Sequence, residues 1–444
     1  MLSYKGYAKS RLEALGIKDY DRVKVVKDNA VFEGLLVPRP KLLDDKHVIL
    51  KLDNGYNVGI KIDNKTTIEV LSRGKPPIKP RKLEKKATSE ERISIVFTGG
   101  TIASKVDYET GAVRPYESPE ELESLIPELK EISDIEYYTA MSIFSEDMTP
   151  ADWIKIAEIA AKLINSGSKG VIIGHGTDTM HYTAAALSFM LRNQTAPVVL
   201  VGAQRSIDRG SSDAVLNLIA SAIVAAKSDI AETVVVMHAT PEDEYCHVIR
   251  GVRARKMHTS RRDAFLSVND KPIAIVTKKK IKYLTNDYNK RRDGKISLDT
   301  RLEPKVGLIY SWPSIEPKVI DAYINMGYKG LVIAGTGLGH IPNRIIPKVE
   351  EAVSSGVAIV IASQCIFGRV NMKVYSTGRR LLAAGAIPAY DMHPETALVK
   401  LMYVLGHTTD LDEIRRLMAQ NMVGEIRECT SMEVYPPGGV RDEL

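Results

Sequence analysis

Residues 93–104 read Ile-Ser-Ile-Val-Phe-Thr-Gly-Gly-Thr-Ile-Ala-Ser, a short apolar run that stops at two glycines between threonines. The β-branched residues at its start are typical of a buried parallel strand. The glycines carry no side chain, so the main-chain N–H groups of this turn can approach a ligand closely. The flanking hydroxyls of Thr98 and Thr101 can cap the next segment, bind that ligand or attack it.

A second stretch repeats this pattern. Residues 170–179, Gly-Val-Ile-Ile-Gly-His-Gly-Thr-Asp-Thr, form another apolar strand that runs into a glycine turn with hydroxyl and carboxylate side chains. Ligands bind beyond the carboxyl ends of strands in an open parallel sheet, so Thr101 and Thr177 can face one cavity if their strands flank the crossover point. The helix that follows, expected to run to about residue 192, needs one capping residue. Capping accounts for one of Thr177, Asp178 and Thr179 but not for all three.

A lysine follows in residues 252–260, Val-Arg-Ala-Arg-Lys-Met-His-Thr-Ser. Most lysines are ordinary surface cations. Held beside Asp178 in a dry cleft, Lys256 would instead help the carboxylate to take a proton from Thr177. The alkoxide left behind could then attack a carbonyl carbon.

Three motifs, in this order, resemble those of the bacterial-type L-asparaginase/glutaminase family: Thr98-Gly-Gly-Thr-Ile-Ala103, Gly174-His-Gly-Thr-Asp-Thr179 and Arg253-x-x-Lys256. The resemblance implies an α/β fold with two asparaginase-like parallel-sheet domains. It implies that Thr101 is the threonine nucleophile and that Thr177 and Asp178 form the family's second Thr-Asp pair. Lys256 then corresponds to the catalytic lysine.

The same resemblance implies where a substrate binds. Ser145 stands where the family binds the α-carboxylate of the substrate. Glu146 takes the place of a glutamine that many members carry beside this serine. The loop tyrosine of the family maps to Tyr108, with Tyr116 as the alternative.

The expected mechanism has two stages. Thr101 attacks the side-chain amide carbonyl while backbone N–H groups of the turns at Gly100 and Gly176 stabilise the oxyanion, and water then hydrolyses the acyl-enzyme. The sequence leaves open whether Thr101 or Thr177 forms the covalent bond.

The chain before the first motif has a different character. Residues 1–71 contain five short Val- and Ile-rich segments separated by turn residues, among them Asn54-Gly55, which predict a small all-β SH3-like barrel. We expect this barrel to dock a partner; a purely structural appendage and contact with RNA are the alternatives. The expected divisions are a barrel at 1–71, a linker at 72–92, a large α/β domain with the active site at 93–280, a linker at 281–303, a small α/β domain at 304–410 and a C-terminal extension at 411–444.

Composition narrows the class of protein. Hydrophobic residues make up 44% and charged residues 26% of the 444, a balance expected of a soluble α/β protein, and a net charge of +6 does not mark a nucleic-acid binder. Three widely spaced cysteines predict reduced thiols in the cytoplasm and no metal site. The N-terminus lacks an apolar signal core, and no apolar run approaches the ~20 residues of a membrane span.

One of these cysteines supports a rival function. Cys365 follows an expected strand and would be the thiol nucleophile of a glutamine amidotransferase, with His340 or His393 as its base. The Gly-x-Cys-x-Gly turn that such a nucleophile favours is absent from the sequence. A free cysteine is also commonly just a small buried apolar residue.

The barrel, the basic linker and the tail exceed what amide hydrolysis requires. The whole architecture resembles the amide-donor subunits of archaeal tRNA-dependent amidotransferases. That resemblance implies hydrolysis of glutamine, or of asparagine as a substitute, without a cofactor in this chain. Ammonia would pass to a partner subunit that binds Glu-tRNA(Gln) and uses ATP and Mg²⁺, in a complex built on a homodimer of this chain. A stand-alone asparaginase/glutaminase and a binding subunit with a vestigial site are the alternatives.

Overall fold

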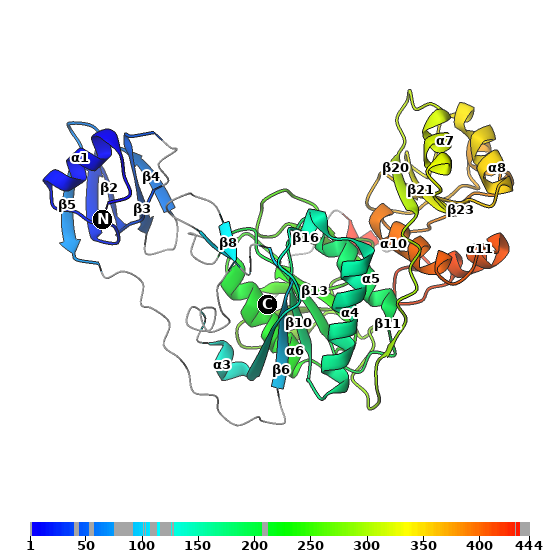
Figure 1. The fold of residues 1–444 in the computed structure, drawn as a ribbon, viewed down its shortest axis with the longest axis horizontal. Helices are drawn as coiled ribbons and strands as arrows, with labels where there is room; N and C mark the ends of the chain where they lie inside the picture. The colour runs from blue at the N-terminus through cyan, green and yellow to red at the C-terminus, as the bar shows by residue number, and fades with distance from the viewer. Residues whose placement is uncertain are drawn as a thin grey trace.

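A computed structural model describes residues 2–39, 44–52, 57–74, 92–100, 102, 104–106, 113–115, 126, 128–206, 212–430 and 432–435. Figure 1 shows an N-terminal domain, a large α/β domain and a small α/β domain along the chain. Within these residues no helix combines the length and the apolar character that crossing a bilayer requires.

The N-terminal domain is one helix on a five-stranded antiparallel sheet. Its strands follow the order β4-β3-β2-β1-β5. Alternate residues of each strand face the helix, so Val23 and Val25 pack with Ala8 and Leu12 in a separate small core. The antiparallel β-structure predicted for this region is confirmed, and the structure adds helix α1 to it. Asn54-Gly55 lies outside the described residues. The elements are α1 (Gly6–Ala14), β1 (Arg22–Lys27), β2 (Ala30–Leu36), β3 (His47–Leu52), β4 (Asn57–Lys61) and β5 (Thr67–Ser72).

The large domain is built on an eight-stranded sheet with the order β18-β17-β14-β13-β12-β10-β6-β9. Strands β9, β6, β10, β12 and β13 are parallel to one another, and β14, β17 and β18 join this sheet by antiparallel pairing. The strands are β6 (Arg92–Phe97), β9 (Asp134–Thr139), β10 (Val171–Gly174), β12 (Val198–Val201), β13 (Thr233–His238), β14 (Cys246–Arg250), β17 (Ala274–Val276) and β18 (Ile281–Tyr283).

Strand β6 marks the point where the chain changes direction across this sheet. It pairs with β9 on one side and with β10 on the other, all three parallel. The two glycine turns, which follow β6 and β10, therefore leave the sheet side by side at the same edge. This is the crossover arrangement that the sequence predicts, and it is where open parallel sheets bind ligands.

Helices cover both faces of the large sheet. Successive strand residues point to opposite faces, so Ile173 packs in the core under α4 and α5, whereas Ile172 packs in the core under α6. Helix α4 begins with a capping box, in which the Thr149 and Asp152 side chains each accept the backbone N–H of the other residue. The helices are α3 (Leu129–Ile132), α4 (Pro150–Asn165), α5 (Met180–Met190) and α6 (Ala214–Lys227).

The small domain is a four-stranded parallel sheet in sequence order. Its helix α10 contacts both this sheet and α5 of the large domain, so the cores of the two domains are continuous. The elements are β20 (Val306–Tyr310), α7 (Lys318–Asn325), β21 (Gly330–Gly335), α8 (Ile346–Ser354), β22 (Ala358–Ser363), α9 (Ser376–Ala383), β23 (Ile387–Pro388), α10 (Pro394–Leu405) and α11 (Leu411–Ala419).

Two regions outside the expected domains contribute elements to them. In the expected linker 281–303, β18 extends the large sheet, and β19 (Ser297–Leu298) pairs with β11 (Leu191–Arg192). In the expected extension 411–444, α11 packs against α10. The remaining short elements are β7 (Ser104–Val106), β8 (Val113–Pro115), β15 (Ala254–Lys256), β16 (Phe265–Ser267) and the 3₁₀ turns η2 (Ser145–Asp147), η3 (Asn343–Ile345) and η4 (Met432–Val434).

Candidate active site

The two glycine turns touch each other. Gly100 has a φ of +80°, and a Cβ placed on it would lie 2.5 Å from the backbone nitrogen of Gly176. A Cβ on Gly176 would lie 2.8 Å from the Cβ of Ser145. Only glycine fits this close approach, so the turns and the Ser145 segment form one compact edge. The structure thus brings together the two turns predicted to stabilise the oxyanion and Ser145, which is predicted to bind the substrate.

Three of the predicted catalytic side chains meet at this edge. The Lys256 ammonium donates to the Thr177 hydroxyl over 2.8 Å and to Asp178 Oδ1 over 2.8 Å. Thr177 is buried, the Lys256 side chain is 9% exposed and the Asp178 side chain is 68% exposed. An ammonium that donates to a hydroxyl oxygen stabilises negative charge on that oxygen. The arrangement therefore suits proton removal from Thr177 or from a group next to it.

Other predicted residues lie outside the described part of the chain. Thr101, Tyr108 and Tyr116 are the predicted nucleophile and the two candidates for the loop tyrosine. Gly100, the residue before Thr101, is described and packs against Gly176, which directly precedes Thr177.

Ser145 and Glu146 begin the short turn η2. Ser145 is buried and its backbone carbonyl accepts a hydrogen bond from the Thr179 hydroxyl over 2.5 Å, whereas Glu146 is exposed. Thr179 is the N-cap residue of α5, but its side chain makes no capping bond. The sequence predicts a side-chain cap from one of three residues here. The structure instead uses the Thr179 hydroxyl to hold the Ser145 segment against the glycine turn.

Sequence reasoning missed Gln204 as a neighbour of this cluster. Its Oε1 lies 3.5 Å from the Thr177 hydroxyl, and Gly202 packs closely on the Thr177 methyl group. The Asp213 carboxylate accepts the backbone N–H groups of Gln204 and Arg205, which holds the turn in place. The signal was present, because residues 202–206 follow a strand and combine a glycine with polar side chains.

His175 holds the second glycine turn in place through contacts of its buried ring. Its Nδ1 lies 2.7 Å from the Gly176 carbonyl oxygen, and its Nε2 lies 2.9 Å from the Thr183 hydroxyl. Burial lowers the pKa of His175 to about 4, so the ring is neutral at physiological pH. A neutral ring that donates from Nδ1 accepts at Nε2, which matches both contacts. His175 therefore orients the Gly176 peptide.

The strand that carries Lys256 is attached to the small domain. Arg253 Nη1 lies 2.9 Å from Asp391 Oδ2, and both side chains are 1% exposed. Arg255 Nη2 lies 2.7 Å from Glu395 Oε1, and its Nε also donates to this carboxylate. Neighbouring strand residues point in opposite directions, so Arg255 faces the small domain while Lys256, the next residue of β15, faces Thr177.

Glu395 is the charged centre of this attachment. Burial favours a raised pKa for its carboxyl, but hydrogen bonds and charges from His393 and Arg255 outweigh burial and hold the pKa well below its usual range. The His393 ring bonds Glu395 and Thr396. His393 is thus engaged elsewhere than at Cys365, which is exposed. These contacts count against His393 as the base of the rival thiol site, whereas both ring nitrogens of His340 lack a hydrogen-bond partner among the described residues.

The fold and the Thr-Asp-Lys cluster define an amidohydrolase of the asparaginase/glutaminase class, and comparisons with known proteins agree. Residues 92–289 match the family model "Asparaginase, N-terminal", residues 305–418 match "Glutaminase/Asparaginase C-terminal domain" and residues 17–71 match "GatD N-terminal domain". The solved L-asparaginase from Thermococcus kodakarensis superposes with a TM-score of 0.68 at 33% identity, over 76% of this chain and 100% of its own. L-asparaginase I from Vibrio cholerae does so with the same TM-score at 32% identity and the same coverage.

Relatives that match nearly the whole chain are more specific. The D subunit of glutamyl-tRNA(Gln) amidotransferase from Pyrococcus abyssi is 51% identical over 95% of this chain and 97% of its own length. The protein of the same name from Thermofilum pendens is 48% identical over 98% of both chains. The chain belongs to the family of glutamyl-tRNA(Gln) amidotransferase D subunits.

Proposed function

We propose that this chain is the glutaminase subunit of a tRNA-dependent amidotransferase. It hydrolyses the side-chain amide of glutamine, or of asparagine, and supplies ammonia to a tRNA-binding partner, the E subunit, which converts Glu-tRNA(Gln) to Gln-tRNA(Gln). The observation that carries this proposal is the contact of Lys256 with Thr177 and Asp178 at the sheet edge where the two glycine turns meet. The near full-length similarity to amidotransferase D subunits supports the coupling to a partner.

The proposed reaction passes through an ester of threonine. Thr101 Oγ1 attacks the amide carbon, a C–O bond forms, and the C–N bond breaks as the leaving nitrogen takes a proton and departs as ammonia. Water then attacks the ester, which releases glutamate and restores the hydroxyl. Thr177, Asp178 and Lys256 form the proton-transfer group, and backbone N–H groups of the two glycine turns stabilise the oxyanion.

Substrate recognition uses the segment next to these turns. Ser145 would bind the α-carboxylate of the substrate through its hydroxyl, and the exposed carboxylate of Glu146 would meet the α-ammonium group. A charge-assisted hydrogen bond of this kind is stronger than a neutral one. Tyr108 or Tyr116 would close over the bound amino acid.

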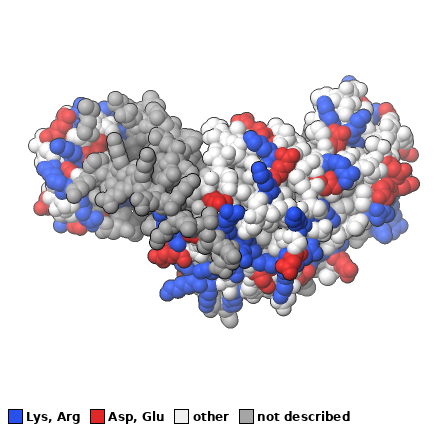
Figure 2. Space-filling view, turned by 60° about the horizontal axis from the view of Figure 1, so that its bottom comes forward, with Lys and Arg blue, Asp and Glu red and all other residues white. Residues whose placement is uncertain are grey.

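The remaining parts of the chain serve assembly. The N-terminal domain docks the tRNA-binding partner, and two copies of this chain form the centre of a two-plus-two complex in the cytoplasm. ATP and Mg²⁺ are used by that partner, and this chain needs no cofactor. On the face drawn in Figure 2, both acidic and basic side chains occur among the described residues. We propose that tRNA binds mainly through the partner.

The mechanism is tested by trapping the ester. The chain is quenched in acid during glutamine turnover, and peptides that contain Thr101 and Thr177 are weighed by mass spectrometry. A glutamyl adduct on Thr101 that disappears in Thr101→Ala supports the proposal. An adduct on Thr177 would instead make Thr177 the nucleophile and assign Thr101 to the proton-transfer group. Substantial glutaminase activity in both Thr101→Ala and Thr177→Ala contradicts the site.

A stand-alone L-asparaginase is the second candidate. Solved L-asparaginases align over their whole length with 76% of this chain. The match of residues 17–71 to the GatD N-terminal domain favours a role within a larger complex. Activity that is indifferent to the tRNA-binding partner would favour the second candidate.

A further inference from the structure

The connection between β17 and β18 carries a run of positive charge. Residues 278–282 read Lys-Lys-Lys-Ile-Lys, and residues 271–286 contain no Asp or Glu. The first three of these lysines, Lys278, Lys279 and Lys280, lie between the end of β17 and the start of β18. We call these three residues the lysine turn.

The backbone of the lysine turn is held by Thr277. The Thr277 N–H donates to the Lys280 carbonyl oxygen over 3.0 Å. The Thr277 hydroxyl accepts the backbone N–H groups of Lys279 over 3.2 Å and of Lys280 over 3.1 Å. All three lysine side chains are exposed. The turn therefore presents three exposed ammonium groups from a hydrogen-bonded backbone.

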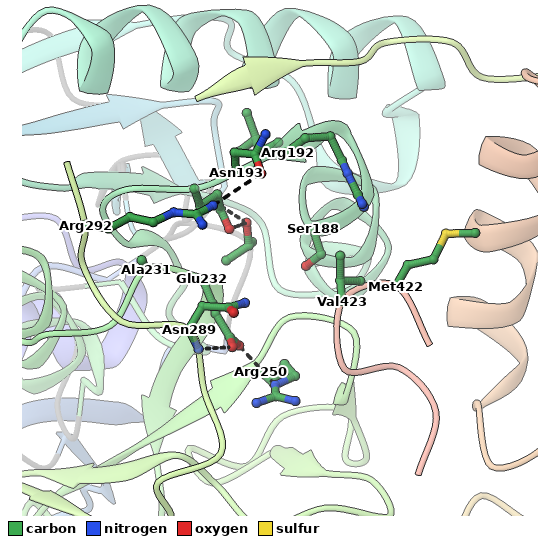
Figure 3. A pocket seen from close by; sticks show the side chains of 13 residues that line it. Ser188, Arg192, Asn193, Ala231, Glu232, Arg250, Asn289, Arg292, Met422 and Val423 are labelled. Atoms are coloured by element: carbon green, nitrogen blue, oxygen red, sulfur yellow. Dashed lines mark hydrogen bonds and ion pairs between the residues drawn. The ribbon is translucent and has the colours of Figure 1, made fainter. Parts of the chain in front are cut away.

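The charge of the lysine turn is not compensated locally. Its side chains form no ion pair and no hydrogen bond with any residue that the structure describes. The cations that follow β18 differ, because Lys290 lies 3.5 Å from Asp229 and Arg291 donates to backbone carbonyl groups. Figure 3 shows Arg292 bonded to Asn193. The lysine turn is thus the part of this basic stretch that is open to an external anion.

The lysine turn lies at the sheet edge that carries the glycine turns. Strand β14 is antiparallel to β13, and β17 is antiparallel to β14, so β17 runs in the same direction as β13, β12 and β10. The lysine turn after β17 and Thr177 after β10 therefore lie at the same edge. Four strand spacings separate β17 from β10, which corresponds to roughly 19 Å across the sheet.

Three exposed lysines without carboxylate partners suit a polyanion with phosphate groups. An ammonium is a compact charge that contacts phosphate without the fixed orientation of a guanidinium. Such contacts release counterions from a nucleic acid and do not depend on its sequence. Lysines on an edge strand also prevent pairing with other strands, which accounts for Lys282 in β18. That role does not account for three successive lysines in the turn before the strand.

We propose that the lysine turn contacts the phosphate backbone of the tRNA held by the partner subunit. This inference rests on the proposed function, in which a tRNA-bound partner uses the ammonia that is released at the glycine turns. The partner has to receive ammonia from this edge of the sheet, so its tRNA lies on the side where the lysine turn is exposed. The tRNA stays bound mainly through the partner, and the lysine turn adds contacts that are independent of sequence.

The test is the affinity of the assembled complex for tRNA. The full-length chain and its partner are titrated with a fluorescently labelled tRNA(Gln) transcript at several salt concentrations, without glutamine or ATP. The triple variant Lys278→Gln, Lys279→Gln and Lys280→Gln should bind about tenfold or more weakly. The slope of log affinity against log salt should become shallower by about 2, because each phosphate contact contributes about 0.7 to 0.9.

A matched triple variant controls for net charge. Lys318→Gln, Lys329→Gln and Lys373→Gln remove three exposed lysines of the small domain and the same total charge. This variant should keep both the affinity and the salt slope. Equal weakening in the two triple variants would show that overall charge sets the affinity, and it would overturn the proposal.

The other outcomes separate this inference from the proposed function. Unchanged tRNA affinity in the lysine-turn variant overturns the inference, also if the variant aggregates more readily, since the lysines then only protect the sheet edge. Weaker assembly with the partner, at unchanged tRNA affinity of the assembled complex, overturns it in favour of a protein interface. In all these cases ammonia release that still rises in the complex leaves the proposed function intact, whereas a complex that binds no tRNA contradicts both.

Discussion

Arg255 and Glu395 join the two α/β domains directly behind Lys256. Arg255 Nη2 lies 2.7 Å from Glu395 Oε1, and the Glu395 side chain is 6% exposed. Because neighbouring strand residues point in opposite directions, the position of the Arg255 side chain determines how β15 presents Lys256 to Thr177. The small domain thus positions Lys256, which we propose takes part in catalysis.

Glu395→Gln should lower kcat for glutamine hydrolysis by about 10- to 100-fold while KM changes little. The substitution leaves Arg255 without its charged partner, and a displacement of about 1 Å in a reacting group can cost about 100-fold in rate. Glu395→Asp, which keeps the charge, should recover part of the rate. Steady-state kinetics of the two variants test this positioning role.

The matched control for Glu395 is Asp299→Asn. This substitution also removes a carboxylate that bonds several partners, Arg301 and His407 among them, but neither of these two lies in β15. The variant should lose thermal stability and keep kcat. If both variants lose stability and kcat in the same proportion, the effect of Glu395 is structural only.

Lys256→Met should reduce kcat by about 100-fold or more, the usual effect of losing a positioned proton-transfer group. Lys256→Arg should not restore the rate, because a planar guanidinium cannot replace a compact ammonium that meets both Thr177 and Asp178. Lys290→Met, which removes an exposed lysine 3.5 Å from Asp229, serves as the control. Full activity in Lys256→Met would contradict the proposed role of Lys256 and with it the proposed active site.

Gly100→Ala should inactivate the chain by about 100-fold through displacement of the glycine turn. An alanine at a φ of +80° is strained by roughly 1–2 kcal/mol, and its Cβ would also collide with the Gly176 backbone. Gly167→Ala is the matched control, since Gly167 has a φ of +97° but open space around a Cβ. It should lose stability and retain activity. Equal activity in the two variants would show that the turns need not touch.

Thermal stability should fall as the pH is lowered from 7 to 5, and His175 should contribute about 2 kcal/mol of that fall. Burial lowers its pKa to about 4, whereas the unfolded chain titrates near 6.5. Between these values the unfolded state binds more protons, so acid favours unfolding. His175→Gln should flatten the profile, and His258→Gln, at an exposed position, should not. An unchanged slope in His175→Gln would mean that His175 is not held neutral.

Much of the site was predictable because the relevant signals are local. Each glycine turn follows a strand of β-branched residues, and parallel strands end at one edge, so Gly100 and Gly176 could be placed together before the fold was known. The capping box of α4 was equally visible in four consecutive residues. These features depend on backbone geometry that short stretches of sequence specify.

The attachment of Lys256 was not predictable in the same way. Arg255 and Glu395 are 140 residues apart in the chain. Arg255 occupies an unspecified position of the Arg253-x-x-Lys256 motif, and Glu395 lies in none of the three motifs. Only the packing of α10 against the large domain makes them neighbours. Residues 281–303 illustrate a second difficulty: their polar composition is typical of a linker, yet β18 adds to the edge of the sheet, where polar residues are tolerated.

The most direct test of the proposed function is the release of ammonia from glutamine by the purified chain. Ammonia release is measured with the chain alone and after addition of the tRNA-binding partner, ATP and Glu-tRNA(Gln). The Lys256→Met variant is the inactive reference. We expect ammonia release that rises strongly in the full mixture and is lost in the reference. Vigorous release that ignores these additions would indicate a free amidohydrolase, and no release under either condition would contradict an active site at Thr177 and Lys256.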